Sequence, residues 1–436
     1  MSKSYLISAE SVSQSHPDKC MDAIANNIQN HLIAFDPMSR VAIEGLITGN
    51  KVFLGGEVKS KAKVDYIKIT RDTINKIGYN GDDFEIQEFI HGQSIDIDNG
   101  VTKDKEEELG SSDQGTIWGY AVKDYNDRYI PLAFSIANRI LLELKRIRIN
   151  EPELMPYLKP DAKAQCTISY GETEPEKIDT IVISTSHTRF DDDDERLLAK
   201  LRKDVREIVM PRVIAHFPEN TQKLFTEETR YLINPANLFI CDFSYADSSE
   251  VGRKIVVDAC GSGTIGYVYD NSGKHIKNIP LPVGGGNYNG KGSDKLDMAA
   301  ALMARYISKN CVAAGLCDYM SIQLSYAIGF RDPVSVFVNT YDSCHVPYLT
   351  DSDIAEKLKN MFDMSTYGIV TTLNLRQPMY EECSAYGWFG RTNKVVHKKF
   401  EDADGNVKEM DVELFTWEKL DAVEKIQNAF FNNTAN

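Results

Sequence analysis

Residues 10–35 read ESVSQSHPDKCMDAIANNIQNHLIAF, and this stretch joins a strand end, a charged tetrapeptide and a helix start. Behind the tetrapeptide His16-Pro17-Asp18-Lys19, apolar residues recur at three- and four-residue spacing, namely Ile24, Ile28, Leu32 and Phe35. This spacing predicts a helix that begins near Pro17. Proline suits the first helical position because its missing N–H would have no intrahelical partner there. The stretch therefore predicts an amphipathic helix close to the N-terminus.

The start of this helix is a candidate anion-binding site. A helix N-terminus carries unpaired N–H groups and a partial positive charge, and His16 and Lys19 stand beside it. Asp18 and Glu10 are candidate metal ligands in the same stretch. Taken alone, the pattern is equally compatible with an ordinary helix start.

The composition is that of an acidic globular protein. A chain of 436 residues is long enough for roughly three domains. Its 64 acidic and 49 basic residues give a net charge of −15, which argues against nucleic-acid and anionic-membrane partners. The eight cysteines form no C-x-x-C pair, which favours a reducing compartment. Because no apolar run approaches the ~20 residues of a membrane span and no signal region is visible, we expect a cytoplasmic protein.

The chain repeats one plan three times. Paired alternating runs predict hairpins over residues 40–60, 163–186 and 320–341, and helical patterns follow at residues 64–77, 194–217 and 352–362. In the first of these helices we expect Val64, Ile67, Ile74 and Ile77 to face inward. Hairpins imply sheets that are at least partly antiparallel. We therefore predict an α/β (α+β) fold of three similar sheet-plus-helix domains, at residues 1–105, 106–235 and 236–436. The polar stretch at residues 91–112 is either a linker or a mobile functional loop.

Two glycine-rich segments lie between the second and third units. Residues 261–266 have the G-x-G-x-x-G spacing, but residues 267–273 read as a strand and turn, whereas a dinucleotide site needs a helix there. Arg253-Lys254 precede an apolar run at residues 255–259 that we expect to form a strand.

The second glycine-rich segment, residues 285–291, resembles a P-loop in its spacing of Gly285, Gly290 and Lys291. A P-loop has Ser or Thr at the next position, where this chain has Gly292. The glycines of the segment, Lys291 and Lys295 still suit phosphate, and Asp297, in a helix predicted at residues 294–309, can hold a cation. The alternative is a solvated linker. Near the C-terminus we expect the aromatic residues at 386–389 to be core, a charged hairpin around residues 404–406, and a helix at residues 422–431.

Six motifs, in order and spread over nearly the whole chain, together resemble the S-adenosylmethionine synthetases, or methionine adenosyltransferases. They are Glu10 with His16-Pro17-Asp18-Lys19, Gly55-Gly56-Glu57, the GSSDQG run at 110–115, Asp161-Ala162-Lys163, Gly252-Arg253-Lys254, and residues 284–297. The resemblance implies three domains with pseudo-threefold symmetry, and a homodimer or dimer of dimers with shared active sites. It also implies two Mg²⁺ ions and one K⁺ ion per site, and ATP and L-methionine as substrates.

In the implied reaction, the methionine sulfur attacks C5′ of ATP, and the expelled tripolyphosphate is hydrolysed to pyrophosphate and phosphate. The residues that the resemblance places against the triphosphate are His16, Lys163, Arg253, Lys254, Lys291 and Lys295. Further ATP contacts are Asp161, Ala162, Phe239, Asp247 and Asn287, and the methionine contacts are Glu57, Gln93, Asp247 and Lys295. The implied magnesium ligands are Asp18, Glu10 and Asp297, and Glu44 matches the potassium ligand.

The chain departs from the family pattern at a few places. Leu238, Asn287 and Gly292 replace the usual residues, and residues 263–282 look like an insertion that forms a surface hairpin. The residues at 91–112 match the family's mobile gate. The main alternative function is that of a non-catalytic, nucleotide-binding regulatory paralogue, which is expected to lose charged residues that this chain retains.

Overall fold

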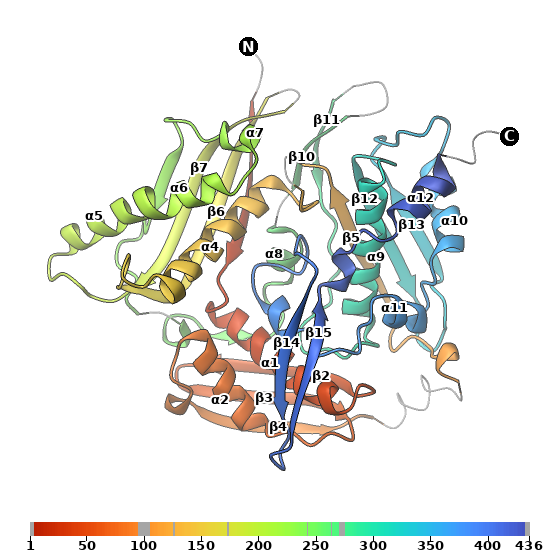
Figure 1. Ribbon diagram of the computed structural model, residues 1–436, viewed down its shortest axis with the longest axis horizontal. Coiled ribbons are helices and arrows are strands. Elements are labelled where there is room, and N and C mark those ends of the chain that lie inside the picture. Colours follow the sequence, from red (N-terminus) through yellow and green to blue (C-terminus); the bar gives the residue numbers. More distant parts are fainter. Residues whose placement is uncertain are drawn as a thin grey trace.

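The protein folds into three sheet-plus-helix units around a common centre (Figure 1). A computed structural model describes residues 4–94, 105–124, 127–171, 174–241, 243–262, 264–269 and 275–431. The predicted fold class is confirmed. Residues 95–104 of the predicted gate, and residues 263 and 270–274 of the predicted insertion, lie outside the described residues.

Three sheets form the framework. The first has the order β4-β3-β2-β9, from Glu85–Gly92, Lys51–Lys59, Arg40–Thr48 and Ser249–Glu250. The second has the order β1-β6-β7-β8, from Tyr5–Val12, Leu158–Tyr170, Pro175–His187 and Arg230–Ile233, and the third is β13-β12-β5, from Ser335–Asn339, Tyr319–Tyr326 and Gly115–Val122. Neighbouring strands are antiparallel except for β3–β4 and β7–β8, so the three predicted hairpins are confirmed.

One long buried helix packs against each sheet. These helices are α1 (Pro17–Phe35), α4 (Leu132–Asn150) and α9 (Leu296–Ala313), and they pack mainly against β2, against β1 and β6, and against β5 and β12. The prediction of α1 is confirmed, and α9 begins two residues later than residues 294–309 suggested. The sequence analysis did not identify α4.

The three units exchange strands in a cycle. β1 comes before α1 but joins the second sheet, and β5 comes before α4 but joins the third. β9 comes before α9 and joins the first sheet through β2. Each sheet therefore contains one strand from another part of the chain, and this arrangement gives the fold its threefold character.

Shorter elements complete the units. The helices are α2 (Tyr66–Ile77), α5 (Asp194–Asp204), α6 (Met210–Ala215), α7 (Glu219–Gln222), α8 (Ile255–Cys260), α10 (Asp351–Met361), α11 (Thr366–Thr372) and α12 (Val423–Phe430), and a π-helical segment, Val205–Val209, joins α5 to α6. Single 3₁₀ turns are η1 (Gly81–Asp83), η2 (Glu106–Glu108), η4 (Phe243–Tyr245), η5 (Glu381–Ser384) and η6 (Thr416–Glu418). The predicted insertion contains the hairpin of β10 (Thr264–Tyr269) and β11 (His275–Pro280).

Two local expectations were wrong. Residues 255–259 form the helix α8 and not a strand, and Gly261 ends that helix in a left-handed conformation at φ 66°. A short β-branched run fits either structure, and here the glycine stop and tertiary packing select the helix. Ile67, assigned to the inward face of α2, is 38% exposed, so the buried face of that helix consists of its other apolar residues.

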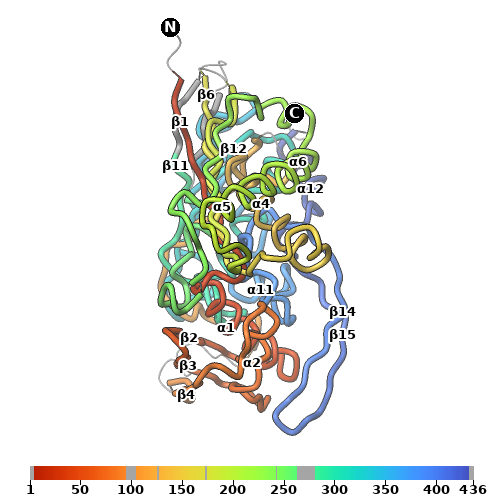
Figure 2. The backbone as a smooth tube through the Cα atoms, turned by 90° about the vertical axis from the view of Figure 1, so that its left-hand side faces the viewer, coloured from red at the N-terminus to blue at the C-terminus, as the bar shows by residue number. Residues whose placement is uncertain are grey.

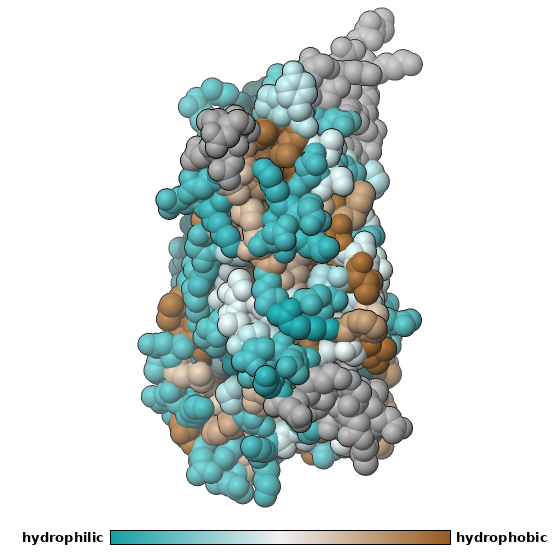
Figure 3. All heavy atoms as spheres, turned by 90° about the vertical axis from the view of Figure 1, so that its right-hand side faces the viewer, coloured by the Kyte–Doolittle hydropathy of each residue, from teal (hydrophilic) through white to brown (hydrophobic). Residues whose placement is uncertain are grey.

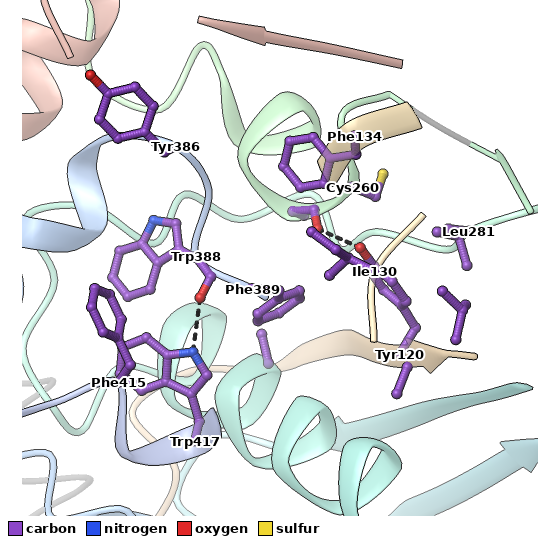
Figure 4. Close-up of a cluster of buried hydrophobic side chains, with 14 of the residues drawn as sticks. Tyr120, Ile130, Phe134, Cys260, Leu281, Tyr386, Trp388, Phe389, Phe415 and Trp417 are labelled. Atoms are coloured by element: carbon purple, nitrogen blue, oxygen red, sulfur yellow. Dashed lines mark hydrogen bonds between the residues drawn. The ribbon is translucent and has the colours of Figure 1, made fainter. Parts of the chain in front are cut away.

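The aromatic residues near the C-terminus are core, as predicted. Trp388, Phe389 and Trp417 are buried together, and the Trp417 indole donates a 2.9 Å hydrogen bond to the Trp388 carbonyl (Figure 4). The Tyr120 hydroxyl donates to the Ala259 carbonyl at 2.8 Å and so ties β5 to α8. This cluster joins the third unit to the segment that follows β9.

The sheets and the C-terminal hairpin lie on opposite sides of the molecule. In Figure 2, β2, β3 and β4 follow one edge, and β14 (Lys394–Glu401) and β15 (Val407–Leu414) follow the other. The hairpin is bound to the first unit, because the Ala403 N–H donates to the Lys63 carbonyl at 2.9 Å and Lys408 Nζ donates to the Ala34 carbonyl at 2.6 Å.

Hydrophilic residues dominate the face of the molecule drawn in Figure 3, which is the right-hand side of Figure 1. Among the described helices, none is long and apolar enough to span a membrane.

We predict that Gly56→Ala lowers the free energy of unfolding by about 3 kcal/mol, measured by urea denaturation. Gly56 has φ 120°, and an added Cβ would lie 2.0 Å from the Ala42 carbonyl oxygen. Gly55→Ala is the matched control, because nothing lies within 4 Å of a Cβ at Gly55. Equal losses in both variants would contradict this account of Gly56.

Candidate active site

His16 is the centre of the first cluster of charged residues. It caps α1, and its Nδ1 accepts a 3.2 Å hydrogen bond from the Asp18 N–H. Burial, followed by the charges of Lys163, Lys254, Lys19 and Arg253, lowers the pKa of His16 to about 2. The imidazole is therefore neutral and lies among four cations.

Asp18 joins the start of α1 to the segment before α8. Lys254 Nζ lies 2.5 Å from Asp18 Oδ2, and the Glu250 N–H donates to Asp18 Oδ1 at 3.0 Å. Arg253 Nε is 3.7 Å from the same Oδ1. Asp18 is fully buried, so its charge balances the cations that crowd His16.

Lys19 corrects the sequence analysis, which placed it at an anion-binding surface. It is fully buried, and its ammonium contacts Asp22 at 2.7 Å and also contacts Asp258. Burial alone would lower the pKa of Lys19, but the two carboxylates outweigh it and raise it. Lys19 is thus a structural cation and does not face a ligand.

The sequence analysis missed Asp22 and Asp258. Asp22 also accepts the Gly252 N–H at 2.9 Å, so it helps to position Arg253 and Lys254. Burial raises the pKa of Asp258 to about 7, although Lys19 opposes that rise. The only signal in the sequence was the i,i+3 spacing of Lys19 and Asp22 on a predicted helix.

Strand β6 supplies Asp161, Ala162 and Lys163. Ser13 and Ala162 exchange backbone and side-chain hydrogen bonds of 2.8 and 3.0 Å, which fix β6 against the turn before His16. Lys163 is exposed and pairs with Val12, while Glu10 pairs with Gln165 two positions away. Glu10 and Lys163 therefore lie on the same face of the second sheet.

Lys291 and Asp297 are the centre of the second cluster, and they form an ion pair. The Asp297 carboxylate folds over Gly286, where an added Cβ would be 2.1 Å from it. Lys295 caps α9, and its N–H donates to the Gly292 carbonyl at 3.0 Å. α1 anchors this loop, because the Gly290 N–H donates to Asn26 at 2.8 Å.

The two clusters meet at Asn287 and Gly252. An added Cβ on Gly252 would lie 2.7 Å from the Asn287 side chain. Asn287 also accepts the Asn289 N–H at 2.9 Å, which holds the loop in a tight turn. The glycine loop and the Arg253-Lys254 segment are therefore in direct contact.

A cross-strand row extends the second cluster over the first sheet. Lys291 bridges to Ala42 of β2, Ala42 pairs with Glu57 of β3, and Glu57 pairs with His91 of β4. Directly paired residues share a face, so Lys291 and Glu57 point to the outward side of the sheet. Glu44 follows Ala42 by two residues on that face, and Lys291 opposes the rise that burial gives the pKa of its carboxyl.

The remaining predicted residues lie around these clusters. Gln93 follows the end of β4, and its Oε1 is buried without a hydrogen-bond partner in the described part of the chain. Phe239 is half-buried, and its N–H donates to His187 Nε2 at 3.1 Å. Asp247 is exposed just before β9. The structure gives no direct contact from these three to His16 or Lys291 among the described residues.

The carboxylates of the site suit magnesium only if a bound ligand supplies further oxygen atoms to the ion. No group of three or more His, Cys, Asp or Glu side chains able to hold a metal occurs among the residues that the structure describes. Magnesium typically takes one or two protein carboxylates and completes its shell with water and substrate phosphates. Asp18 and Asp297, each beside a lysine, fit that mode of binding.

Cations from three separate segments therefore converge near a neutral histidine, with carboxylates placed between them. A site of this kind is typical of enzymes that handle a polyphosphate, because such a group needs several positive charges around it. The fold of three sheet-plus-helix units narrows this class of enzymes further.

Comparison with known families identifies the family. Models of the S-adenosylmethionine synthetase N-terminal, central and C-terminal domains match residues 4–103, 108–239 and 243–401. The S-adenosylmethionine synthase of Azobacteroides pseudotrichonymphae is 43% identical over 442 residues, covering 98% of this chain and 100% of the relative. Those of Cytophaga hutchinsonii and Phocaeicola vulgatus are 42% and 43% identical, each covering 98% of this chain and 99% of the relative. The chain belongs to the S-adenosylmethionine synthetase family and is an enzyme of the methionine adenosyltransferase type.

We predict that Lys19→Met lowers the free energy of unfolding by about 3–5 kcal/mol, because it leaves two buried carboxylates without their cation. The control is Lys51→Met, whose partner Glu85 is about half exposed and whose loss costs at most about 1 kcal/mol. Adding Asp258→Asn to Lys19→Met is expected to recover part of the loss. Denaturation of the four proteins measures this, and a Lys19→Met variant as stable as the control would contradict it.

Proposed function

We propose that the protein makes S-adenosylmethionine from L-methionine and ATP, and that the displaced tripolyphosphate is then hydrolysed to pyrophosphate and phosphate. The observation that carries the proposal is the neutral His16 among Lys163, Lys254 and Arg253. A thioether sulfur is already nucleophilic and needs no general base. Catalysis then depends on alignment and on neutralising the leaving group, which is what clustered cations supply.

Each predicted site residue has a place in this proposal. The triphosphate lies against His16, Lys163, Arg253, Lys254, Lys291 and Lys295, with Asp161, Ala162, Phe239, Asp247 and Asn287 as further ATP contacts. Methionine lies against Glu57, Gln93, Asp247 and Lys295. The ion pairs of Lys254 with Asp18 and of Lys291 with Asp297 support the assignment, because a bound polyphosphate can take over each lysine and free each carboxylate.

Metal ions complete the proposal. Asp18, Asp297 and Glu10 are the carboxylates that would hold the two Mg²⁺ ions, which neutralise phosphate charge when bound. Glu44, two residues along β2 from Ala42 and on the same face of the sheet as Glu57, would hold K⁺. We also propose a cytoplasmic location, in keeping with eight cysteines that are all free thiols, seven of them buried.

Product analysis tests the reaction. The protein is incubated with ATP, Mg²⁺ and methionine, and the products are separated by mass spectrometry. A sulfonium product together with pyrophosphate and phosphate is expected. ATP binding without a sulfonium product would favour the regulatory alternative, which the retained charges oppose.

We predict that Lys163→Met or Lys291→Met lowers turnover at least about a hundredfold, or on the order of 3 kcal/mol, because each removes a charge that stabilises the leaving group. Lys203→Met, on the exposed face of α5, is the control and is expected to keep full turnover. Turnover is measured from the sulfonium product. Unchanged turnover in either site variant would remove that lysine from the site.

Assembly is the last part of the proposal. The outward face of the first sheet carries Glu44 and Glu57 beside apolar side chains, with Phe89 64% and Leu46 38% exposed. An apolar surface of this kind favours a partner. We propose a homodimer, or a dimer of dimers, in which Glu57 and Gln93 serve a site whose cations around His16 come from the other subunit.

We predict that co-expressing Glu57→Gln and Lys163→Met chains restores roughly a quarter of normal activity. About half of the dimers are mixed, and each mixed dimer has one intact site of two. Each variant alone is expected to be nearly inactive. No recovery at any mixing ratio would mean that each site lies within one chain.

A further inference from the structure

A cavity of about 240 Å³ lies between α4 and the segment around η5, and it uses no residue of the two clusters. Its charged lining consists of Lys76, Lys145, Arg391, Glu381 and Glu382. Tyr386 also lines it, and Figure 4 shows that side chain at the edge of the aromatic cluster with its hydroxyl pointing away from the tryptophans.

The two carboxylates of the lining are already paired. Glu381 lies 2.6 Å from Lys76, and Glu382 lies 2.6 Å from Lys398. Lys145 and Arg391, by contrast, form no ion pair within the described ranges. Lys145 donates to the Gln14 side chain at 2.5 Å, and Arg391 donates to backbone carbonyls, including that of Ala385 at 2.7 Å.

Like charges crowd Lys145. Burial, then Arg148, Arg391 and Lys76, lowers the pKa of Lys145 to about 8, and Glu381 opposes the shift. The Tyr386 oxygen accepts the Gln14 N–H, so its own proton remains available to donate. An ammonium, a guanidinium and a phenol therefore line one cavity, and the two carboxylates of that cavity are each paired with another lysine.

We propose that this cavity binds a small phosphate-type oxyanion. Such an ion offers several acceptor oxygens, which suit three converging donors, and its charge offsets the repulsion among the cations. The cavity is far larger than the ~10–15 Å³ that one water needs. Gln14 links the site to His16, two residues further along the chain, so an ion here would contact the turn that carries His16. The inference does not depend on the proposed reaction.

Labelling of Lys145 tests the proposal on the full chain. An amine-acetylating reagent is applied at pH 8, and the rate of modification of each lysine is followed by peptide mass spectrometry. About half of the Lys145 amine is neutral at that pH, and an anion that raises its pKa by one unit leaves about a tenth neutral. Inorganic phosphate is therefore expected to slow labelling of Lys145 about fivefold and to leave exposed Lys203 unaffected.

Matched salts and two variants decide the outcome. Sodium chloride and sodium acetate at equal ionic strength are expected to protect Lys145 much less than phosphate. Glu381→Gln removes a competing carboxylate and is expected to lower the phosphate concentration needed for half-protection, whereas Tyr386→Phe removes a donor and is expected to raise it. Absence of protection by phosphate, or equal protection by chloride or acetate, would overturn the proposal.

Discussion

The site depends on the buried ion pairs that the Lys19 ammonium forms with two carboxylates. This ammonium lies between Asp22 on its own helix and Asp258 of α8, two elements more than two hundred positions apart in the chain. Asp22 in turn holds the Gly252 N–H, and Asp18 holds Lys254. Because unpaired buried charges are costly, α1 and the segment before α8 have one favourable relative position. The cations around His16 thus owe their spacing to a lysine that does not face the site.

The sequence predicted the fold well where local patterns carry the information. The hairpins, α1 and the glycine loop follow from alternation, spacing and capping residues, which act between near neighbours. Residues 255–259 show the limit of this reasoning, because a short run of β-branched residues suits a strand, and only Gly261 and the contacts of Tyr120 make it a helix. The role of Asp258 could not be predicted from the sequence either, because its partner Lys19 is distant in the chain.

Most candidate site residues could be named from their motifs, but their grouping could not. No pattern in the chain indicates that Lys291, Ala42 and Glu57 form one row, because the bridge between the glycine loop and β2 is a tertiary contact. Nor does any pattern show that Asn287 packs on Gly252, where a glycine is needed for close approach. Such contacts link a lysine that we propose to bind phosphate to the face that carries the residues predicted to bind methionine.

The cyclic exchange of strands has a consequence for how the chain is made. The first sheet remains open along the edge of β2 until Ser249 and Glu250 have been synthesised, and β1 waits for β6 of the second unit. While the chain is being synthesised, it therefore exposes unpaired strand edges, and strands of other chains can pair with them. The three regions matched by separate family models are consequently not independent folding bodies, and a shortened chain would lose the edge protection that its missing neighbour provides.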